Sequence, residues 1–147
     1  MQNKIQLIQL PKILDTRGNL SVVQQLQHIP FAIQRVYWIY DVPGGELRGS
    51  HAFKTCSEFI VALSGSYDVV LHDGVNEHRF HLNRSYYGLF VPPMTWRYLE
   101  NFSTNSLALV MCSHAFNAQD YIRDFDEFIK APAPEGEKEK KIFYDLS

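Results

Sequence analysis

The sequence has few cysteines, no excess of basic residues and no long apolar run. Among its 147 residues only Cys56 and Cys112 are cysteines, they form no Cys-x-x-Cys pair, and no secretory leader precedes the first strand-like run. The 14 Lys and Arg residues against 16 Asp and Glu give a net charge of −2, which argues against a phosphate-tracking nucleic-acid surface. No apolar stretch approaches the roughly 18 residues of a membrane span. We therefore expect a reduced, cytoplasmic protein without nucleic-acid or membrane partners.

The sequence has the alternating pattern of β-strands, and its length fits one domain. Most segments alternate apolar and polar residues with period two, and turn signals such as Ser64-Gly65, Asp73-Gly74 and Pro92-Pro93 separate them. The predicted strands are 5–9, 19–24, 33–40, 56–63, 66–72, 76–82, 87–91, 95–101 and 106–112. This spacing is typical of an all-β sandwich or barrel, and the hairpin-linked strands between residues 56 and 82 suggest a meander within a jelly roll.

One α-helix is predicted near the C-terminus. Asn117 can cap it, and the apolar residues at helical spacing would bury one face against the sandwich. These apolar residues are Tyr121, Ile122, Phe125, Phe128 and Ile129. The Pro-bearing, charge-dense segment that follows cannot offset its ordering entropy by burial. The chain is therefore divided into a domain over residues 1–130 and a charged linker with a short tail over residues 131–147.

Two motifs in the middle of the chain carry chemical information. The residues at the spacing of the first cupin motif are Gly45, His51, Glu58 and Gly65. In this motif Phe53 stands where cupins have a second histidine. The second cupin motif, Pro-x-Gly-x-x-His-x-x-x-Asn, is echoed by residues 92–101, with Met94 for the glycine and Arg97 for the histidine. With both motifs in order in an all-β pattern, the chain resembles the cupins, which implies a jelly-roll barrel.

The four metal-ligand positions of the cupin motifs no longer form a metal site here. Alternate residues of a strand point to the same side, so cupin ligands converge inside the barrel on a divalent ion. The positions read His51, Phe53, Glu58 and Arg97 in this chain. A guanidinium beside a divalent ion would be repelled by it. We expect no metal and no cofactor, and a reaction that proceeds by another route.

The side chains that remain are those of an acid–base and anion site. His51 titrates near neutrality and can act as a general base. Arg48 and Arg97 can hold a phosphate or stabilise an enolate-like oxygen. Phe53, two residues after His51, lies on the same side of the strand and is expected to wall the site.

Three further residues are candidates with two interpretations each. Arg35 shares a strand face with apolar residues, so it is either a site residue or one that reaches past the barrel rim. Tyr37 and Trp96 can stack on a base or a sugar, although such residues in a β protein more often belong to the core.

Taken together, a series of short blocks resembles the nucleotide-sugar 3,4-ketoisomerases of the WxcM-like cupin group. The blocks are Asp15-x-Arg17-Gly18, Arg35-Val36-Tyr37, Arg48-Gly49-x-His51-Ala52-x-Lys54, Leu63-x-Gly65, Asp73-Gly74, Gly88-Leu89, Pro92-Pro93, Trp96 and Asp120-Tyr121-Ile122-Arg123. The resemblance implies a metal-free homodimer that moves the keto group of a dTDP-4-keto-6-deoxyhexose from C4 to C3, on the way to a 3-aminated sugar for surface polysaccharide. An apolar run at residues 5–10, which would otherwise leave an open sheet edge, also favours a homodimer.

The resemblance also implies roles for individual residues. His51 is the expected base, and Tyr37 and Arg48 are expected to polarise the keto oxygen. The expected substrate-binding residues are Arg17, Arg35, Phe53, Trp96 and Arg97.

The chain departs from the family at Phe53 and Arg97, where relatives have histidines. A two-histidine relay therefore does not carry over, but a shift through an enediol can use one base that lifts the C3 proton and returns a proton to C4. Two alternatives stay open: a neighbouring nucleotide-sugar epimerase, and a catalytically silent sugar-nucleotide-binding protein. Isomer analysis separates the first from the isomerase, and turnover against binding separates the second.

Overall fold

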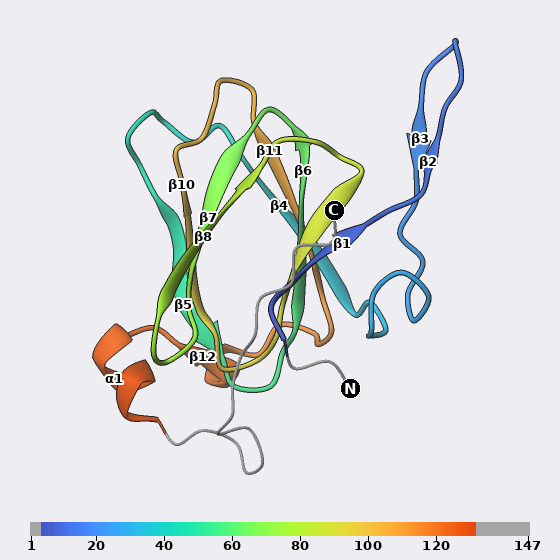
Figure 1. The fold of residues 1–147 in the computed structure, drawn as a ribbon. Coiled ribbons are helices and arrows are strands. Elements are labelled where there is room, and N and C mark those ends of the chain that lie inside the picture. Colours follow the sequence, from blue (N-terminus) through green and yellow to red (C-terminus); the bar gives the residue numbers. More distant parts are fainter. Residues whose placement is uncertain (1–3, 132–147) are drawn as a thin grey trace.

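Period-two alternation folds the chain into two antiparallel sheets that face each other (Figure 1). The computed structural model describes residues 4–131, so the predicted linker and tail lie outside the described residues except for Ala131. The first sheet has the order β1 (Gln6–Gln9), β9 (Tyr87–Val91), β6 (Glu58–Ser64), β11 (Leu107–Cys112), β4 (Arg35–Tyr40). The second has the order β12 (Tyr121–Ile122), β5 (Arg48–Phe53), β10 (Trp96–Glu100), β7 (Tyr67–His72), β8 (Glu77–Leu82). The all-β fold class with one C-terminal helix is thus confirmed.

The core lies between the two sheets, and both outer faces are covered in part. Inward side chains such as Ile60, Leu89 and Leu99 are fully buried. On the outer face of the first sheet, Phe59, Phe90 and their neighbours are covered by Ile29 and Phe31 from the segment before β4. Each large apolar side chain buried in this way contributes about 1.5–3 kcal/mol to folding. The barrel wall is therefore a rigid frame for the side chains that point into it.

The C-terminal helix is shorter than the sequence predicts. Asn117 caps a 3-10 turn, η1 (Ala118–Asp120), and α1 (Phe125–Lys130) begins after Asp124, whose side chain accepts from the backbone N–H of Asp126. Between these elements Tyr121 and Ile122 form β12, because they complete the open edge of β5. Pairing with that edge satisfies backbone groups that a helix would leave unused there. The helix does lie on the sandwich, as predicted.

Three further strands differ from the prediction, and two of them, β2 (Lys12–Ile13) and β5, lie outside every predicted strand. β5 carries the first cupin motif but was not among the nine predicted strands, because its glycine and charged residues hide the alternation. Of the predicted strand 19–24, only β3 (Leu20–Ser21) pairs, with β2.

Met94, in the glycine position of the second motif, adopts a left-handed φ of 57°. Its N–H donates to the carbonyl of Phe53 at 2.7 Å, which fixes the start of β10 against the end of β5.

The hairpin of β2 and β3 projects from the barrel as an arm (Figure 1). Its apolar side chains Ile13 and Leu14 are 56% and 70% exposed. On the outer face of the edge strand β4, Val36, Trp38 and Tyr40 are also exposed. The arm and the outer face of β4 thus both leave apolar side chains in water.

Candidate active site

Four strands direct polar side chains into the barrel interior. β4 contributes Tyr37, β5 contributes His51, β6 contributes Glu58 and β10 contributes Arg97. β10 and β5 pair so that Arg97 and His51 stand directly opposite each other. Each residue alternates with neighbours on the outer face, such as Trp96 beside Arg97, so the pleat places all four on the inner side.

Arg97 and Glu58 form a fully buried ion pair that includes Tyr37. Arg97 Nε donates to Glu58 Oε1 and Nη2 donates to Oε2, both at 2.9 Å. The Tyr37 hydroxyl accepts from Arg97 Nη2 at 2.6 Å and donates to Glu58 Oε2 at 2.6 Å. Although burial raises the pKa of Glu58, the charge and hydrogen bonds of Arg97 hold it below its ordinary value. Burial raises the pKa of Tyr37, so its phenol stays protonated.

Gly49 is required where Arg97 reaches across to β5. Its carbonyl accepts from Arg97 Nη1 at 2.9 Å, and its φ is +77°. A Cβ at this position would clash with Arg97 Nη1. The glycine of the Arg-Gly-x-His sequence is the only residue that leaves this space. The Arg97 guanidinium can therefore lie beside the His51 imidazole.

His51 is buried and neutral beside this network. Burial, followed by the charge of Arg97, lowers its pKa to about 3, so the imidazole is unprotonated at neutral pH. Its Nε2 is buried and has no hydrogen-bond partner among the described residues. The ring packs edge-on against Phe53 at 4.7 Å and against Tyr121 at 4.9 Å between centroids. A neutral imidazole with an unused nitrogen is a base ready to accept a proton.

Arg35 lies on the other side of the aromatic cluster. Its guanidinium carbon is 5.5 Å from the ring centre of Tyr37 and 6.0 Å from that of Phe53. Its Nη1 donates to the hydroxyl of Tyr121 at 3.3 Å, and its Nη2 donates to the sulfur of Cys112 at 3.6 Å. It forms no ion pair with any residue of the described ranges, and this leaves a positive charge available to an anion.

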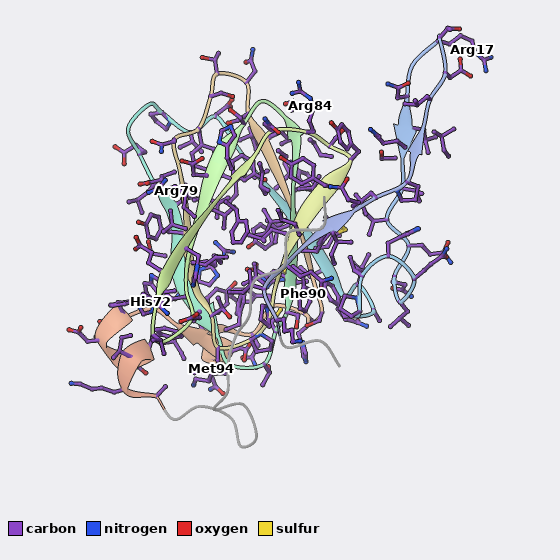
Figure 2. All side chains as sticks on the ribbon, viewed as in Figure 1. Arg17, His72, Arg79, Arg84, Phe90 and Met94 are labelled. Atoms are coloured by element: carbon purple, nitrogen blue, oxygen red, sulfur yellow. The ribbon has the colours of Figure 1, made fainter. Side chains whose placement is uncertain are left out.

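The structure brings together five of the eight predicted site residues, His51, Tyr37, Arg35, Phe53 and Arg97. The remaining three lie apart from this cluster within the chain. Arg17 is at the tip of the arm, where it pairs with Asp15 at 2.7 Å (Figure 2). Arg48 lies at the exposed start of β5 and, with Trp38 and Tyr40, lines a surface hollow of about 420 Å³. Trp96 faces outward and packs on Phe125 and Phe128 of α1.

Three residues of the site were absent from the predicted set. Glu58 was considered only as a metal-ligand position, yet it is the partner that fixes Arg97 and Tyr37. Tyr121 contacts His51, Phe53 and Arg35, and the Arg123 guanidinium carbon lies 4.2 Å from the Tyr121 ring centre. The signal for the last two was the Asp-Tyr-Ile-Arg block, but interpreting it as a helix placed Tyr121 on the wrong element.

The donor set agrees poorly with a metal. No group of three or more His, Cys, Asp or Glu side chains within residues 4–131 lies close enough to hold a metal ion. Both oxygens of Glu58 are taken by Arg97 and Tyr37, so the carboxylate is not free to ligate. Over the same residues the structure contains no helix with the length and apolar character of a membrane span.

Comparisons with known proteins agree on one relationship. The FdtA family model, described as WxcM-like, C-terminal, matches residues 3–133. The TDP-4-oxo-6-deoxy-alpha-D-glucose-3,4-oxoisomerase of Aneurinibacillus thermoaerophilus is 39% identical over 130 residues, which are 88% of this chain and 92% of the relative. The TDP-quinovose 3,4-ketoisomerase WlaRB of Campylobacter jejuni is 37% identical, with a TM-score of 0.83 over 86% of this chain and 98% of that one.

A second solved relative carries its ligand. The 3,4-ketoisomerase QdtA of Thermoanaerobacterium thermosaccharolyticum is 32% identical, with a TM-score of 0.84 over 88% of this chain and 94% of that one. This structure is a histidine-to-asparagine mutant in complex with TDP-4-keto-6-deoxyglucose.

Proposed function

The chain belongs to the FdtA family of WxcM-like, C-terminal domains, and from this premise we propose that it is a nucleotide-sugar 3,4-ketoisomerase. Its substrate is a dTDP-4-keto-6-deoxyhexose, and the keto group moves from C4 to C3 through an enediol. The observation that carries this proposal is the neutral, buried imidazole of His51 with its unpartnered Nε2 beside the cationic groups of the barrel.

The isomerisation needs one base and a means to stabilise oxygen charge. His51 takes the proton from C3, which leaves an enediolate whose charge is on the C4 oxygen, and the imidazolium then delivers a proton to C4. Arg35 stabilises the charge on the C4 oxygen, and this oxygen takes the proton of the C3 hydroxyl, so the new carbonyl forms at C3 while C4 carries a hydroxyl group. Atoms and electrons balance without an oxidant, because the proton lost by the C3 carbon is matched by the one gained at the C4 carbon, and the proton lost by the C3 oxygen is gained by the C4 oxygen.

The network around Arg97 commits the Tyr37 hydroxyl to Arg97 and Glu58, so Tyr37 is a fixed part of the barrel wall. The guanidinium makes four hydrogen bonds and is 1% exposed, so its donors are already committed to protein oxygens. We assign it the task of holding the Tyr37 hydroxyl in place. Arg35, which has a charge without an acidic partner among the described residues, is then the inner cation that meets the substrate.

A second copy of the chain is the partner that fits the exposed apolar arm. Ile13 and Leu14 on the arm and Trp38 on the outer face of β4 leave apolar surface in water, and a homodimer would cover it. Arg17 at the arm tip is 88% exposed at its side chain. In such a dimer Arg17 serves as a substrate-binding residue in the barrel of the partner, which reconciles its place in the family motif with its distance from His51.

The cellular setting follows from the same premise. Cys56 and Cys112 are free thiols, which fits the reducing cytoplasm. The 3-keto product is suited to amination at C3, and we place that step in the synthesis of surface polysaccharide. No metal or cofactor is required by the mechanism, because His51 carries the proton between the two carbons and Arg35 supplies the countercharge.

The proposal is tested by incubating the protein with dTDP-4-keto-6-deoxyglucose in deuterated water and recording NMR spectra of the sugar ring. We expect the carbonyl carbon to appear at C3 and deuterium to enter at C4. If deuterium enters beside a carbonyl that stays at C4, the protein is an epimerase instead. If the sugar binds but stays unchanged, the protein is a silent binder.

A further inference from the structure

Tyr121 occupies a place in the site that the proposed mechanism does not use. Its ring contacts both inward-facing residues of β5, at 4.9 Å from the His51 ring centre and 4.6 Å from that of Phe53. Its hydroxyl accepts a hydrogen bond from Arg35 Nη1 at 3.3 Å. One side chain thus contacts both the expected base and the inner cation.

The backbone holds Tyr121 firmly at this position. β12 pairs with β5 so that Tyr121 stands directly opposite Phe53. The preceding Asp120 is buried, and its carboxylate accepts from the backbone N–H groups of Thr55 and Cys56 at 2.9 and 3.1 Å. Its carbonyl accepts from the N–H of Lys54 at 2.9 Å. These bonds join the segment of Tyr121 to the end of the strand that carries His51.

We propose that Tyr121 is a positioning residue that fixes the imidazole of His51 with its ring and the guanidinium of Arg35 with its hydroxyl. The proposal rests on the proposed function in taking His51 as the base of the isomerisation. The reason lies in the hydrogen bonds of the imidazole: its buried Nε2 has no partner among the described residues, so ring packing must orient it. Phe53 supplies one edge contact, and Tyr121 supplies the other.

The two halves of the side chain can be separated by substitution. Tyr121→Phe keeps the ring and removes the hydroxyl, so Arg35 loses a hydrogen bond while the imidazole keeps its contact. We expect KM to rise about three- to tenfold, as for the loss of one ordinary hydrogen bond, because the bond is long at 3.3 Å, with kcat within about twofold. Tyr121→Leu removes the ring, and we expect kcat to fall on the order of 10- to 100-fold, since small misplacement of a base is costly.

The pKa of His51 separates a positioning role of Tyr121 from a merely structural one. A merely structural role would leave this pKa unchanged. The charged groups that face it are Arg97 on β10, Glu58 on β6, Arg35 on β4 and Arg123 after β12. In Tyr121→Leu these groups remain, but water replaces the ring, so the pKa of His51 rises toward its ordinary range. The acid limb of the kcat/KM profile then moves to higher pH, whereas in Tyr121→Phe it stays where the wild-type protein has it.

The experiment measures kcat, KM and the acid limb for the wild-type protein and both variants, and follows the His51 imidazole by NMR titration. The His51 signal is identified by its loss in His51→Asn. Tyr98→Leu, which removes a tyrosine from the outer face of β10, is the matched control and is expected to leave the titration unchanged. If the leucine variant fails to fold, Tyr121→Met retains more volume and provides the same comparison.

The outcomes separate this proposal from the proposed function. A raised His51 pKa in Tyr121→Leu but not in Tyr121→Phe supports the positioning role. If the wild-type protein fails to turn over the sugar while the pKa still moves in this way, the isomerase assignment fails and the positioning role stands. A His51 titration that is the same in both variants and the wild-type protein overturns the positioning role, whether or not the protein is an isomerase.

Discussion

Replacing Arg97 by methionine is expected to lower the free energy of unfolding by about 3–5 kcal/mol, the range for removing one partner of a buried ion pair. The guanidinium is 1% exposed and makes four hydrogen bonds, two of them to Glu58. After its removal the Glu58 carboxylate stays buried with the Tyr37 hydroxyl as its remaining strong donor. For a chain of this size each kcal/mol shifts Tm by about 2–4 °C, so Tm should fall by roughly 10 °C.

Arg79→Met is the matched control for this measurement. Arg79 also bonds two carboxylates, those of Asp68 and Glu100, at 2.8 and 2.7 Å. It lies on the outside of the second sheet with its side chain 47% exposed (Figure 2), so water screens both pairs. Its replacement should cost less than about 1 kcal/mol, as for other surface ion pairs. The difference between the two variants measures the effect of burial.

The pH dependence distinguishes the loss of charge pairing from the loss of packing. In the wild-type protein the folded pKa of Glu58 is depressed, so the pair stabilises above the ordinary carboxylate pKa and the stabilisation is lost as pH falls through the folded value. In Arg97→Met burial raises the pKa of Glu58, and the variant recovers part of its deficit on acidification because the carboxylate becomes neutral. In thermal melts from pH 8 down to about pH 5, the gap in unfolding free energy between the wild-type protein and Arg97→Met should therefore narrow. A gap below about 1 kcal/mol, or one independent of pH, would refute the reasoning.

Four other predictions concern the proposed mechanism and assembly. His51→Asn should lower kcat on the order of 10²-fold or more while nucleotide binding, measured by calorimetry, stays nearly intact; unchanged turnover would place the base elsewhere. Phe53→His should keep or raise the wild-type rate, and a loss of activity would show that the aromatic wall is itself required. Extended dialysis against EDTA should leave the rate unchanged, so activity that returns only with added zinc, iron or manganese contradicts a metal-free site. Sedimentation should show a dimer that becomes monomeric when Ile13 and Leu14 are both replaced by lysine; a wild-type monomer at micromolar concentration would contradict the dimer.

Much of the barrel could be predicted because apolar and polar residues alternate along the sequence with the period-two pattern of β-strands. Tyr67, Val69 and Leu71 in β7 and Phe80 and Leu82 in β8 are apolar at every second position, and the pairing of Val70 with Arg79 in the structure follows from the Asp73-Gly74 turn between the strands. β5 was harder to find since Gly49 and His51 are selected for the site and not for strand propensity. The segment that departs furthest from local pattern is thus the one that carries the chemistry.

The site was predictable in composition but not in its connections. The cupin spacing placed His51, Glu58 and Arg97 at converging positions, yet a sequence does not show that Arg97 bonds Glu58 at both oxygens. Tyr121 was assigned to a helix because helical spacing and strand pairing both suit Tyr-Ile followed by Phe. The open edge of β5, a feature of the tertiary structure, selects the strand.

The two departures of this chain from the cupin ligand set are physically linked. Arg97 neutralises Glu58, and its charge also opposes protonation of the imidazole opposite it, so the pKa of His51 falls further than burial alone would bring it. Phe53, packed edge-on at 4.7 Å, adds no charge beside the imidazole. An arginine at one former ligand position and an aromatic ring at the other therefore give a consistent site: the charge is paired, the base is neutral, and the remaining nitrogen of His51 is left for the substrate.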